Sequence, residues 1–340
     1  MLDDPAYAGP PHSDASLGSR TADKLDSWRY RAARSRIPIS RRRRLIAIVN
    51  FRERIHFADW HARWINANSR SFHAVVTGRP RDADIVWIHA QDPMTENARR
   101  RVKDILAEHP GVPVINPPEC YNFYHEAGSF QRLADAGVSV PIEILGDDDY
   151  SGLVVYKEAD TQAAQKSLEV YDGPRPGYRA FSYLDLEYRD GMFRRYRVFY
   201  VCGWVRPSKL FVAKSWKVGV RSCERVYYGF RLTERMEDAT RAIARTSGLD
   251  FFALDVLVRE EDDEPFVVDI NIYPRIHSLH STQNAARRLF RPHTFDARRL
   301  LGMPEPGGVP AWASFDAAVS SWYDEKVAAS PRGSATVRVA

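Results

Sequence analysis

The sequence predicts an α/β protein whose C-terminal half is an α+β arrangement of antiparallel strands. Two patterns lead to this fold class. Between about residues 45 and 116, short apolar runs alternate with segments of helical spacing, as in a parallel sheet with crossover helices. From Tyr178 onward, apolar runs follow one another across short turns, which is typical of antiparallel strands. A chain of 340 residues is long enough for roughly two to three compact units.

The N-terminal half is expected to begin with a disordered segment, residues 1–25, which is rich in Pro, Gly, Ser and Asp. Helices are predicted around 57–64 and over 95–108. No GxGxxG or GxxxxGKS/T motif follows the first apolar run, so the usual dinucleotide and P-loop devices are missing. Buried strands are predicted at LIAIVN (45–50), HAVVT (73–77), DIVWIH (84–89) and VPVIN (112–116).

The C-terminal half opens with a short predicted helix over 126–136, followed by a strand that carries Lys157. YDGPRPG (171–177) is a turn-rich break. A further helix is predicted over 234–247. Antiparallel strands are predicted at YRAFSYLDLEY (178–188), MFRRYRVFYVCG (192–203) and KLFVAKSWKV (209–218), and a final hairpin at DFFALDVLV (250–258) and PFVVDINIYP (265–274).

Composition and charge argue against several classes of protein. No apolar run reaches the ~18 residues needed to span a bilayer, and the N-terminus lacks the apolar core of a signal peptide, so a cytoplasmic protein without membrane contact is the expectation. The three cysteines have no CxxC spacing. The net charge is +5, but the run SRRRRLIAIVN reads as a solvated lead into a strand. Nucleic acid is therefore not a favoured partner, because no zinc-finger, RRM or helix-turn-helix pattern accompanies the basic run.

The final hairpin brings two acids and an amide together. The simplest pairing sets Val258 opposite Phe266 across the turn. In that register Asp255 lies opposite Asp269, and Asn271 shares their face. Two carboxylates this close repel each other unless a cation or a proton lies between them, and three hard oxygen donors suit Mg²⁺ or Mn²⁺. The alternative is that the Asp269–Asn271 pair caps the following loop and that Asp255 is a surface residue.

Several segments resemble, in the right order, the ATP-grasp superfamily of carboxylate–amine ligases. The hairpin with its acid-x-Asn pair before a proline resembles the metal-binding hairpin of that family. LADAGVSVPI resembles the segment that leads into the lid subdomain, and LVVYK the strand whose lysine contacts ATP phosphates. FSYLD resembles the hinge strand that meets adenine, and RRYRVFYVCGWVRP the long strand that points an arginine at the reacting phosphate. The resemblance covers roughly residues 45–300.

The resemblance implies a domain order and a set of site residues. It implies a Rossmann-like pre-ATP-grasp domain over 40–118, a lid subdomain over 119–180, a C-terminal subdomain with an antiparallel sheet and the metal site over 181–305, and a helix and tail over 306–340. It implies that Lys157, Ser182, Tyr183, Leu184, Asp185 and Lys214 contact ATP, that Arg195, Arg197 and Arg275 serve the chemistry, and that Asp255, Asp269 and Asn271 hold the metal.

Each of these residues also has a simpler interpretation. Lys157 can be an ordinary lysine at a strand end, and Arg195 and Arg197 can form cross-strand ion pairs. Tyr183 can be a core residue, and Lys214 can face solvent. The residues alone leave both interpretations open.

The function implied by the resemblance is a Mg²⁺-dependent ATP-grasp ligase that activates a carboxylate as an acyl phosphate and couples it to an amine, releasing ADP and phosphate. Its partners would be small-molecule or peptide acids and amines, and a homodimer is left open. One alternative is a phosphotransferase of the same fold. The other is a non-catalytic nucleotide-binding protein, suggested by the short, glycine-poor segment EADTQAAQKSLEVYDG after Lys157.

Overall fold

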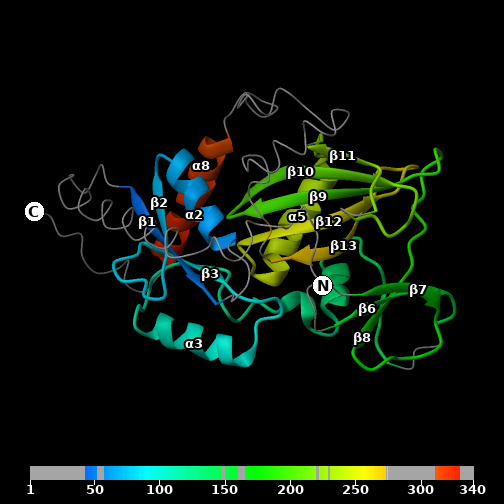
Figure 1. Ribbon diagram of the computed structural model, residues 1–340, viewed down its shortest axis with the longest axis horizontal. Coiled ribbons are helices and arrows are strands. Elements are labelled where there is room, and N and C mark those ends of the chain that lie inside the picture. Colours follow the sequence, from blue (N-terminus) through cyan, green and yellow to red (C-terminus); the bar gives the residue numbers. More distant parts are fainter. Residues whose placement is uncertain are drawn as a thin grey trace, which may run out of the picture.

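The computed structural model describes residues 43–51, 57–146, 150–159, 165–219, 222–228, 230–272, 274 and 311–329. The described residues form three β-sheets with helices packed against them, which is a mixed α/β architecture (Figure 1). None of the helices in these ranges has the length and apolar character needed to cross a bilayer. The N-terminal segment 1–25 and Arg275 lie outside the described residues, so the expectations for them stay predictions.

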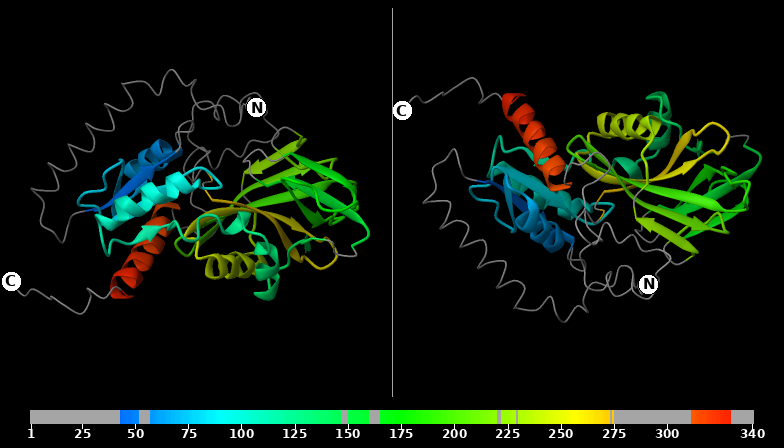
Figure 2. Two further views of the ribbon diagram at one scale, coloured as in Figure 1. Left: turned by 90° about the horizontal axis from the view of Figure 1, so that it is seen from below. Right: turned by 90° about the horizontal axis from the view of Figure 1, so that it is seen from above.

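The first sheet is parallel and has the strand order β2-β1-β3-β4, which confirms the parallel arrangement predicted from the alternating pattern. Its central strands are buried because helices cover both faces. Val102 of α3 packs with Val86 on one face, whereas α2 and α8 pack against Ile46 and Trp87 on the other (Figure 2). The elements are β1 (Arg44–Asn50), α2 (Phe57–Asn68), β2 (Phe72–Val76), β3 (Ile85–His89), α3 (Glu96–Ala107), β4 (Val114–Ile115) and α8 (Ala311–Ala329).

Asp316 binds α8 to the segment just before β2. Its replacement by alanine should lower the free energy of unfolding by about 1–3 kcal/mol, the cost of leaving the buried Ser69 hydroxyl and two partly buried N–H groups without their acceptor. Asp316 is 6% exposed. Its carboxylate accepts hydrogen bonds from the Ser69 hydroxyl at 2.5 Å and from the backbone N–H groups of Arg70 at 2.8 Å and Ser71 at 3.0 Å. Urea denaturation measures the loss.

The control for this change is Asp324→Ala in the same helix. The Asp324 carboxylate pairs with Arg44 at 3.1 Å, but its side chain is 65% exposed. A solvent-exposed ion pair contributes about 0–1 kcal/mol. A loss for Asp316→Ala no larger than that for Asp324→Ala would mean that the hydrogen bonds of Asp316 do not hold the helix in place.

The second sheet is antiparallel and small, with the strand order β5-β8-β6-β7. The chain enters it through a single 3-10 turn and a short helix, which begins at Ser129 and not at 126 as predicted. Part of the glycine-poor segment after Lys157 forms a strand, β7. The elements are η2 (Phe123–His125), α4 (Ser129–Asp135), β5 (Glu143–Ile144), β6 (Leu153–Glu158), β7 (Lys166–Val170) and β8 (Tyr178–Ser182).

The third sheet is the largest, with five antiparallel strands in the order β11-β10-β9-β12-β13. The predicted helix over 234–247 is confirmed: Thr233 caps its start, and Gly248, with φ +71, ends it. The predicted strand 209–218 is wrong at both ends, because β10 starts directly after Gly203 and stops at Ala213. The elements are β9 (Phe193–Val201), β10 (Trp204–Ala213), β11 (Arg225–Tyr228), α5 (Glu234–Ser247), β12 (Phe251–Val258) and β13 (Pro265–Asn271).

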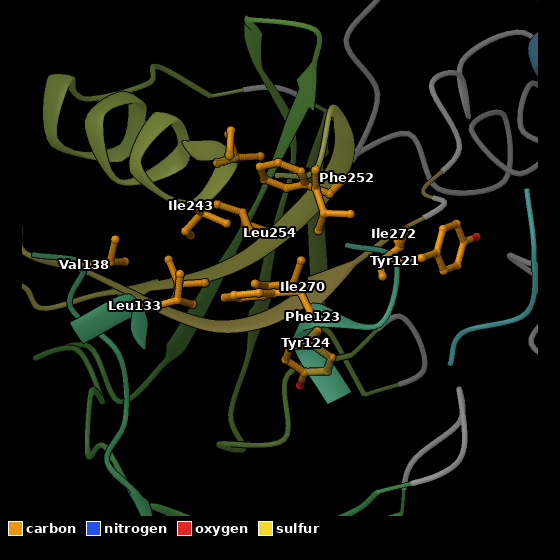
Figure 3. Close-up of a cluster of buried hydrophobic side chains, with 14 of the residues drawn as sticks. Tyr121, Phe123, Tyr124, Leu133, Val138, Ile243, Phe252, Leu254, Ile270 and Ile272 are labelled. Atoms are coloured by element: carbon orange, nitrogen blue, oxygen red, sulfur yellow. The ribbon is translucent and has the colours of Figure 1, made fainter. Parts of the chain in front are cut away.

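One apolar core fixes the orientation of the β12–β13 hairpin. Leu254 and Ile270 are cross-strand partners, and both are buried with Ile243 of α5 and Leu133 of α4 (Figure 3). Successive side chains of a strand point to opposite faces. Burying this pair against the helices therefore turns the neighbouring Asp255 and Asp269 to the other face of the sheet.

Candidate active site

A β-bulge sets the register of the hairpin. Next to the turn, Val258 pairs with Pro265 and not with Phe266, so the simplest pairing predicted from the sequence is wrong there. The register then shifts between Asp255 and Val256, and from this point Asp255 lies opposite Asp269. A bulge inserts one extra residue on one strand, which here restores the predicted pair of acids. The predicted juxtaposition of the two carboxylates is confirmed.

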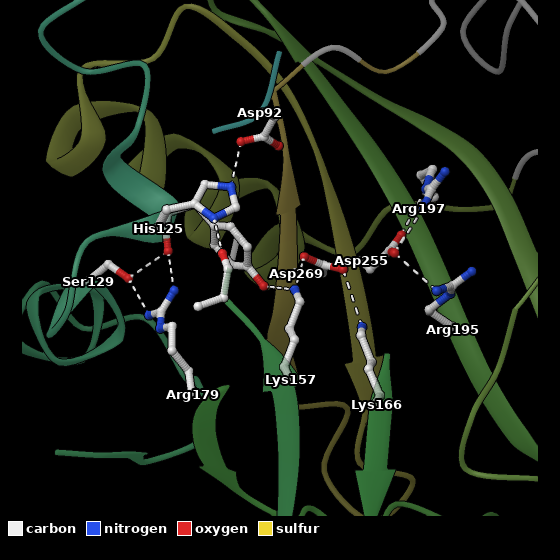
Figure 4. A network of polar contacts seen from close by, with 12 residues as sticks. Asp92, His125, Ser129, Lys157, Lys166, Arg179, Arg195, Arg197, Asp255 and Asp269 are labelled. Atoms are coloured by element: carbon white, nitrogen blue, oxygen red, sulfur yellow. Dashed lines mark hydrogen bonds and ion pairs between the residues drawn. The ribbon is translucent and has the colours of Figure 1, made fainter. Parts of the chain in front are cut away.

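Asp255 is held by two arginines of the neighbouring strand. Asp255 and Arg197 are cross-strand partners, and the Arg197 guanidinium donates from Nε to Oδ1 at 2.8 Å and from Nη2 to Oδ2 at 2.9 Å. Arg195 Nη1 lies 3.1 Å from Oδ2. The cross-strand ion pair left open for these arginines is therefore present, and it fixes both guanidinium groups on the face that carries the acids (Figure 4).

Asp269 is held by two lysines that come from the second sheet. Lys157 of β6 donates to Oδ1 at 2.7 Å, and Lys166 of β7 donates to Oδ2 at 3.4 Å (Figure 4). Lys157 pairs in register with Lys166 on one side and with Arg179 of β8 on the other, so three cations stand in a row across this sheet. Like charges placed directly opposite each other destabilise a sheet, so such a row indicates a site built for anions.

Arg179 has its own counter-ion within this row. Its guanidinium donates to Glu143 Oε1 at 3.0 and 2.8 Å, and also to the Ser129 hydroxyl at 2.9 Å. Arg179 therefore fastens α4 to the second sheet. Lys157 and Lys166 are the cations of the row that reach the third sheet.

The protonation of these groups follows from burial and from neighbouring charge. Burial by itself would raise the pKa of the Asp269 carboxyl, but the ammonium groups of Lys157 and Lys166 outweigh it and hold the pKa well below its usual range. Burial would likewise raise the pKa of Asp255, and Arg195 and Arg197 lower it. Burial lowers the pKa of Lys157 to about 8, against the opposing effect of the Asp269 carboxylate.

The charges of the cluster do not cancel. Four cations (Lys157, Lys166, Arg195 and Arg197) surround two ionised carboxylates (Asp255 and Asp269), which leaves a surplus of two positive charges near neutral pH. A largely buried surplus of this kind attracts anions. The arrangement can therefore bind an anionic group such as phosphate beside a pair of carboxylates.

Apolar side chains lie along the same face of the second sheet, beyond the cations. Leu153 is 44% and Val170 is 68% exposed, and the two are cross-strand partners on the face that carries Lys157 and Lys166. The Tyr183 N–H donates to the Leu153 carbonyl at 2.9 Å, and the Tyr183 ring lies 6.2 Å from that of Trp216. One face thus has an exposed apolar end and a cationic end.

The predicted hinge residues Ser182–Asp185 follow this apolar end. Ser182 is buried, and its hydroxyl accepts a hydrogen bond from the Ile142 N–H at 2.9 Å. Because the Tyr183 N–H is already bonded to Leu153, the backbone group that Tyr183 can offer a ligand is its carbonyl. Burial, and then the charge of Asp185, raises the pKa of the Tyr183 hydroxyl to about 12. Leu184 and Asp185 lie next to it in the chain.

Lys214 is not brought into the cluster. Its side chain is 75% exposed and lies 3.3 Å from Glu224. It lines a surface hollow of about 620 Å³ with Arg194 and Val212, which point to the sheet face opposite Arg195. The predicted contact of Lys214 with ATP stays a prediction that this geometry does not favour.

Two site residues escaped sequence analysis. Lys166 gave a weak signal, because it stands directly before SLEV, in which polar and apolar residues alternate, but only its pairing with β6 brings it to Asp269. Tyr124 gave none. Its hydroxyl accepts a hydrogen bond from the Lys157 ammonium, and burial, together with the Asp269 charge, raises the pKa of this hydroxyl well above the usual value. Tyr124 of η2 therefore contacts the Lys157 ammonium, which is itself bound to Asp269.

Residues of α2 and of the segment after β4 bind the chain at the start of β12 and just after β13. The buried amide of Asn116, which follows β4, donates to the Phe251 carbonyl at 2.7 Å and the Ile272 carbonyl at 3.4 Å. His61 of α2, which is 1% exposed, donates from Nε2 to the Pro274 carbonyl at 3.1 Å. The segment directly after Asn271 is therefore positioned by the N-terminal half of the protein.

The residues present fit a divalent metal ion. Within the described ranges, no group of three or more His, Cys, Asp or Glu residues is arranged to hold one. A site would instead use the Asp255 and Asp269 carboxylates and the Asn271 amide. The Asn271 Nδ2 atom is buried and has no hydrogen-bond partner among the described residues. Turning this carboxamide by 180° would place its oxygen there as a ligand, and hard oxygen donors of this kind suit Mg²⁺.

Comparisons by sequence and by structure give different results. No protein-family model matches the chain, and no curated protein matches it by sequence. Among solved structures, it is similar to the ATP-grasp ligase PsnB complexed with a minimal precursor, Mg and ADP, with 14% identity over 74% of this chain and 97% of that chain and a TM-score of 0.46.

Two further solved structures are similar to this chain. One is D-alanine–D-alanine ligase from Bacillus anthracis, with 10% identity over 84% and 98% of the two chains and a TM-score of 0.49. The other is a RimK domain ATP-grasp protein from Sphaerobacter thermophilus, with 12% identity over 74% and 95% and a TM-score of 0.43. PsnB and the Sphaerobacter protein carry the name of the family that the sequence resembles. At these identities and TM-scores, the activity has to be argued from the chain's own residues.

Proposed function

We propose that this protein is an ATP-grasp ligase that activates a carboxylate as an acyl phosphate and couples it to an amine, releasing ADP and phosphate. The observation that carries the proposal is the cluster of two facing carboxylates with a surplus of two cations, supplied by two different sheets. Such a cluster complements a polyphosphate that brings a divalent metal ion with it.

One face of the second sheet would be the binding surface for a nucleoside triphosphate. Lys157 and Lys166 would contact the phosphates as point charges. Leu153 lies four residues before Lys157 on the same strand face, a separation of about 13 Å at ~3.3 Å per residue. A purine placed over Leu153 and Val170, with its edge toward the Tyr183 and Leu184 backbone, would leave its phosphates beside the lysines. The Asp185 carboxylate would lie near the ribose of the bound nucleotide.

Asp255, Asp269 and Asn271 would hold Mg²⁺ or Mn²⁺, with their oxygens as ligands. When bound, the metal supplies positive charge that neutralises the transferring phosphate. Arg195 and Arg197 would remain bound to Asp255, on the same sheet face, where the phosphate chain would lie. Both guanidinium groups are held there by Asp255 before any ligand arrives.

The chemistry follows from the poor reactivity of a carboxylate, which is anionic and has a poor leaving group. The substrate carboxylate attacks the γ-phosphorus of ATP, and ADP leaves. The amine then attacks the acyl carbon, phosphate leaves with the bonding electrons, and the nitrogen gives up a proton. Arg197, with Arg195 beside it, would face the charge that develops on the phosphate. Arg275 stays a candidate for gripping the incoming carboxylate.

The test is a screen of ADP formation from ATP and Mg²⁺ against a panel of amino acids and short peptides. A ligase releases ADP and phosphate only when an acid and an amine are both present. ADP formation that needs a hydroxyl acceptor, without free phosphate, would instead identify a phosphotransferase. ATP binding without turnover under any condition would identify a non-catalytic nucleotide-binding protein.

Nucleotide affinity should fall as the pH rises above about 8. Burial sets the pKa of Lys157 to about 8, so its ammonium form dominates below that pH and the neutral amine above it. A phosphate binds the ammonium, so deprotonation costs affinity, by at most about tenfold per pH unit when one proton is involved. Fluorescence or calorimetric titration with ADP between pH 7 and 9.5 measures the slope.

The matched control is Lys157→Arg, because an arginine side chain keeps its charge over this range. Its ADP affinity should be flat across the same pH values, whatever its absolute level. An unchanged slope in Lys157→Arg would assign the pH dependence to another group.

A further inference from the structure

Every oxygen that the acidic pair could offer a metal ion already lies against a cation of the protein. Lys157 occupies Asp269 Oδ1 at 2.7 Å, and Lys166 lies 3.4 Å from Oδ2. Arg197 covers both oxygens of Asp255, at 2.8 and 2.9 Å. A divalent cation that approaches the pair alone would meet four positive side chains.

The ion pairs of Asp255 and those of Asp269 differ in how easily they can be exchanged. Arg197 is a cross-strand partner of Asp255 and forms a two-point pair with it, so its geometry is fixed within one sheet. The lysines reach Asp269 from the other sheet, on flexible side chains that are 13% and 26% exposed. The Lys157–Asp269 and Lys166–Asp269 contacts are therefore the ones that can be exchanged.

We propose that Mg²⁺ and the nucleotide bind cooperatively by exchanging these ion pairs, with the metal taking Asp269 while Lys157 and Lys166 transfer to the phosphates. The proposal rests on the function proposed above. Metal alone would leave the Lys157 ammonium largely buried beside a second positive charge. Nucleotide alone would bring phosphates against two ionised carboxylates. Each ligand therefore removes the cost that the other meets, and such coupling is reciprocal.

The proposal makes an unusual prediction for Lys157→Met. Removing the lysine frees Asp269, so the affinity for metal alone should rise by about tenfold or more, while the affinity for ADP falls. A residue that served only to bind phosphate would lower ADP affinity and leave metal affinity unchanged. The sign of the change in metal affinity separates the two roles.

The measurement uses Mn²⁺ as the probe, with no nucleotide present. Electron paramagnetic resonance of free Mn²⁺ gives the affinity of the full-length protein for the metal, and calorimetry with ADP in EDTA gives the affinity for the nucleotide. This design avoids the association of metal with nucleotide in solution. Lys103→Met, which removes one exposed charge on α3, is the matched control and should leave Mn²⁺ affinity as in the wild type.

Two further variants keep the outcome decisive. Lys157→Arg retains the cation and should bind Mn²⁺ alone no more tightly than the wild type. Lys166→Met, at a more exposed and more distant contact, should show the same sign as Lys157→Met with a smaller size, and it decides the matter if Lys157→Met does not fold.

Unchanged or weaker Mn²⁺ binding in the folded methionine variants would overturn the exchange. That result differs from a failure of the proposed function itself, in which the wild-type protein would bind no ADP at all. Stronger Mn²⁺ binding in these variants, together with weaker ADP binding, is the result expected of the exchange.

Discussion

Arg197→Ala should lower kcat for ADP formation by about 10²–10³, the scale for removing one preorganised donor, with a smaller change in KM for ATP. Arg197 is held toward the acidic pair by its two-point contact with Asp255, so it can meet the phosphate as charge builds on it. Interactions that are stronger in the transition state than in the ground state raise kcat, whereas uniform binding lowers only KM. Steady-state kinetics with saturating acid and amine provide both constants.

Arg197→Lys should rescue little of this loss, because a point charge lacks the two-point fork. The matched control is Arg194→Ala on the same strand. Arg194 points to the opposite face and pairs with Asp190 at 2.5 Å on the surface, so its removal should leave kcat near the wild-type value. If Arg197→Ala changes only ATP affinity, Arg197 is a binding residue, and if it changes only thermal stability, Arg197 is a structural residue. In either case Arg195 becomes the next candidate for contacting the transferring phosphate.

Asp269→Asn and Asn271→Ala should each abolish Mg²⁺-dependent turnover while leaving the protein folded. The first change keeps the shape of the side chain and removes the charge that the two lysines and a metal ion would share. The second removes the amide whose Nδ2 atom is buried without a partner, so the fold loses no hydrogen bond made by that atom among the described residues. Turnover at saturating Mg²⁺ measures the effect, and circular dichroism checks the fold.

Asp262→Asn tests whether any loss of an acid in this hairpin has the same consequence. Asp262 lies in the exposed turn of the hairpin and pairs with Arg259 at 2.7 Å. It should retain full turnover. Normal activity in both Asp269→Asn and Asn271→Ala would rule out the metal assignment, because the hairpin would then have to act without its acid-x-Asn pair.

The sequence predicted the pairing of Asp255 with Asp269 but not the β-bulge next to it. The predicted pair is correct, although the pairing assumed at the turn is not, because a β-bulge shifts the register between the two. Alternation along each strand makes the shared face readable from sequence, since it depends only on residues two apart. A bulge depends on how two strands meet, and PFVVDIN gives no sign of it.

The partners of the acids could be predicted only in part, unlike the acids themselves. Arg197 lies on a neighbouring strand of the same sheet, so the sequence could offer an ion pair as one of two interpretations. Lys166 binds Asp269 from a part of the chain more than 100 residues away, and Tyr124 contacts Lys157 beside it. The spacing of polar and apolar residues in the sequence does not predict such contacts, because they depend on how the second sheet packs against the third.

The sequence by itself determined the parallel and antiparallel halves, the α5 helix and the polar face of the final hairpin. These features depend on local periodicity and on capping residues, which act over a few positions. Only the tertiary structure decided that Lys157 and Lys166 lie on Asp269 and that Lys214 lies in a hollow on the other face. It also decided that His61 of α2 and Asn116, which follows β4, bind the segment after β13. Ion pairs and buried hydrogen bonds between sheets form wherever packing brings charges together, and packing is a property of the whole chain.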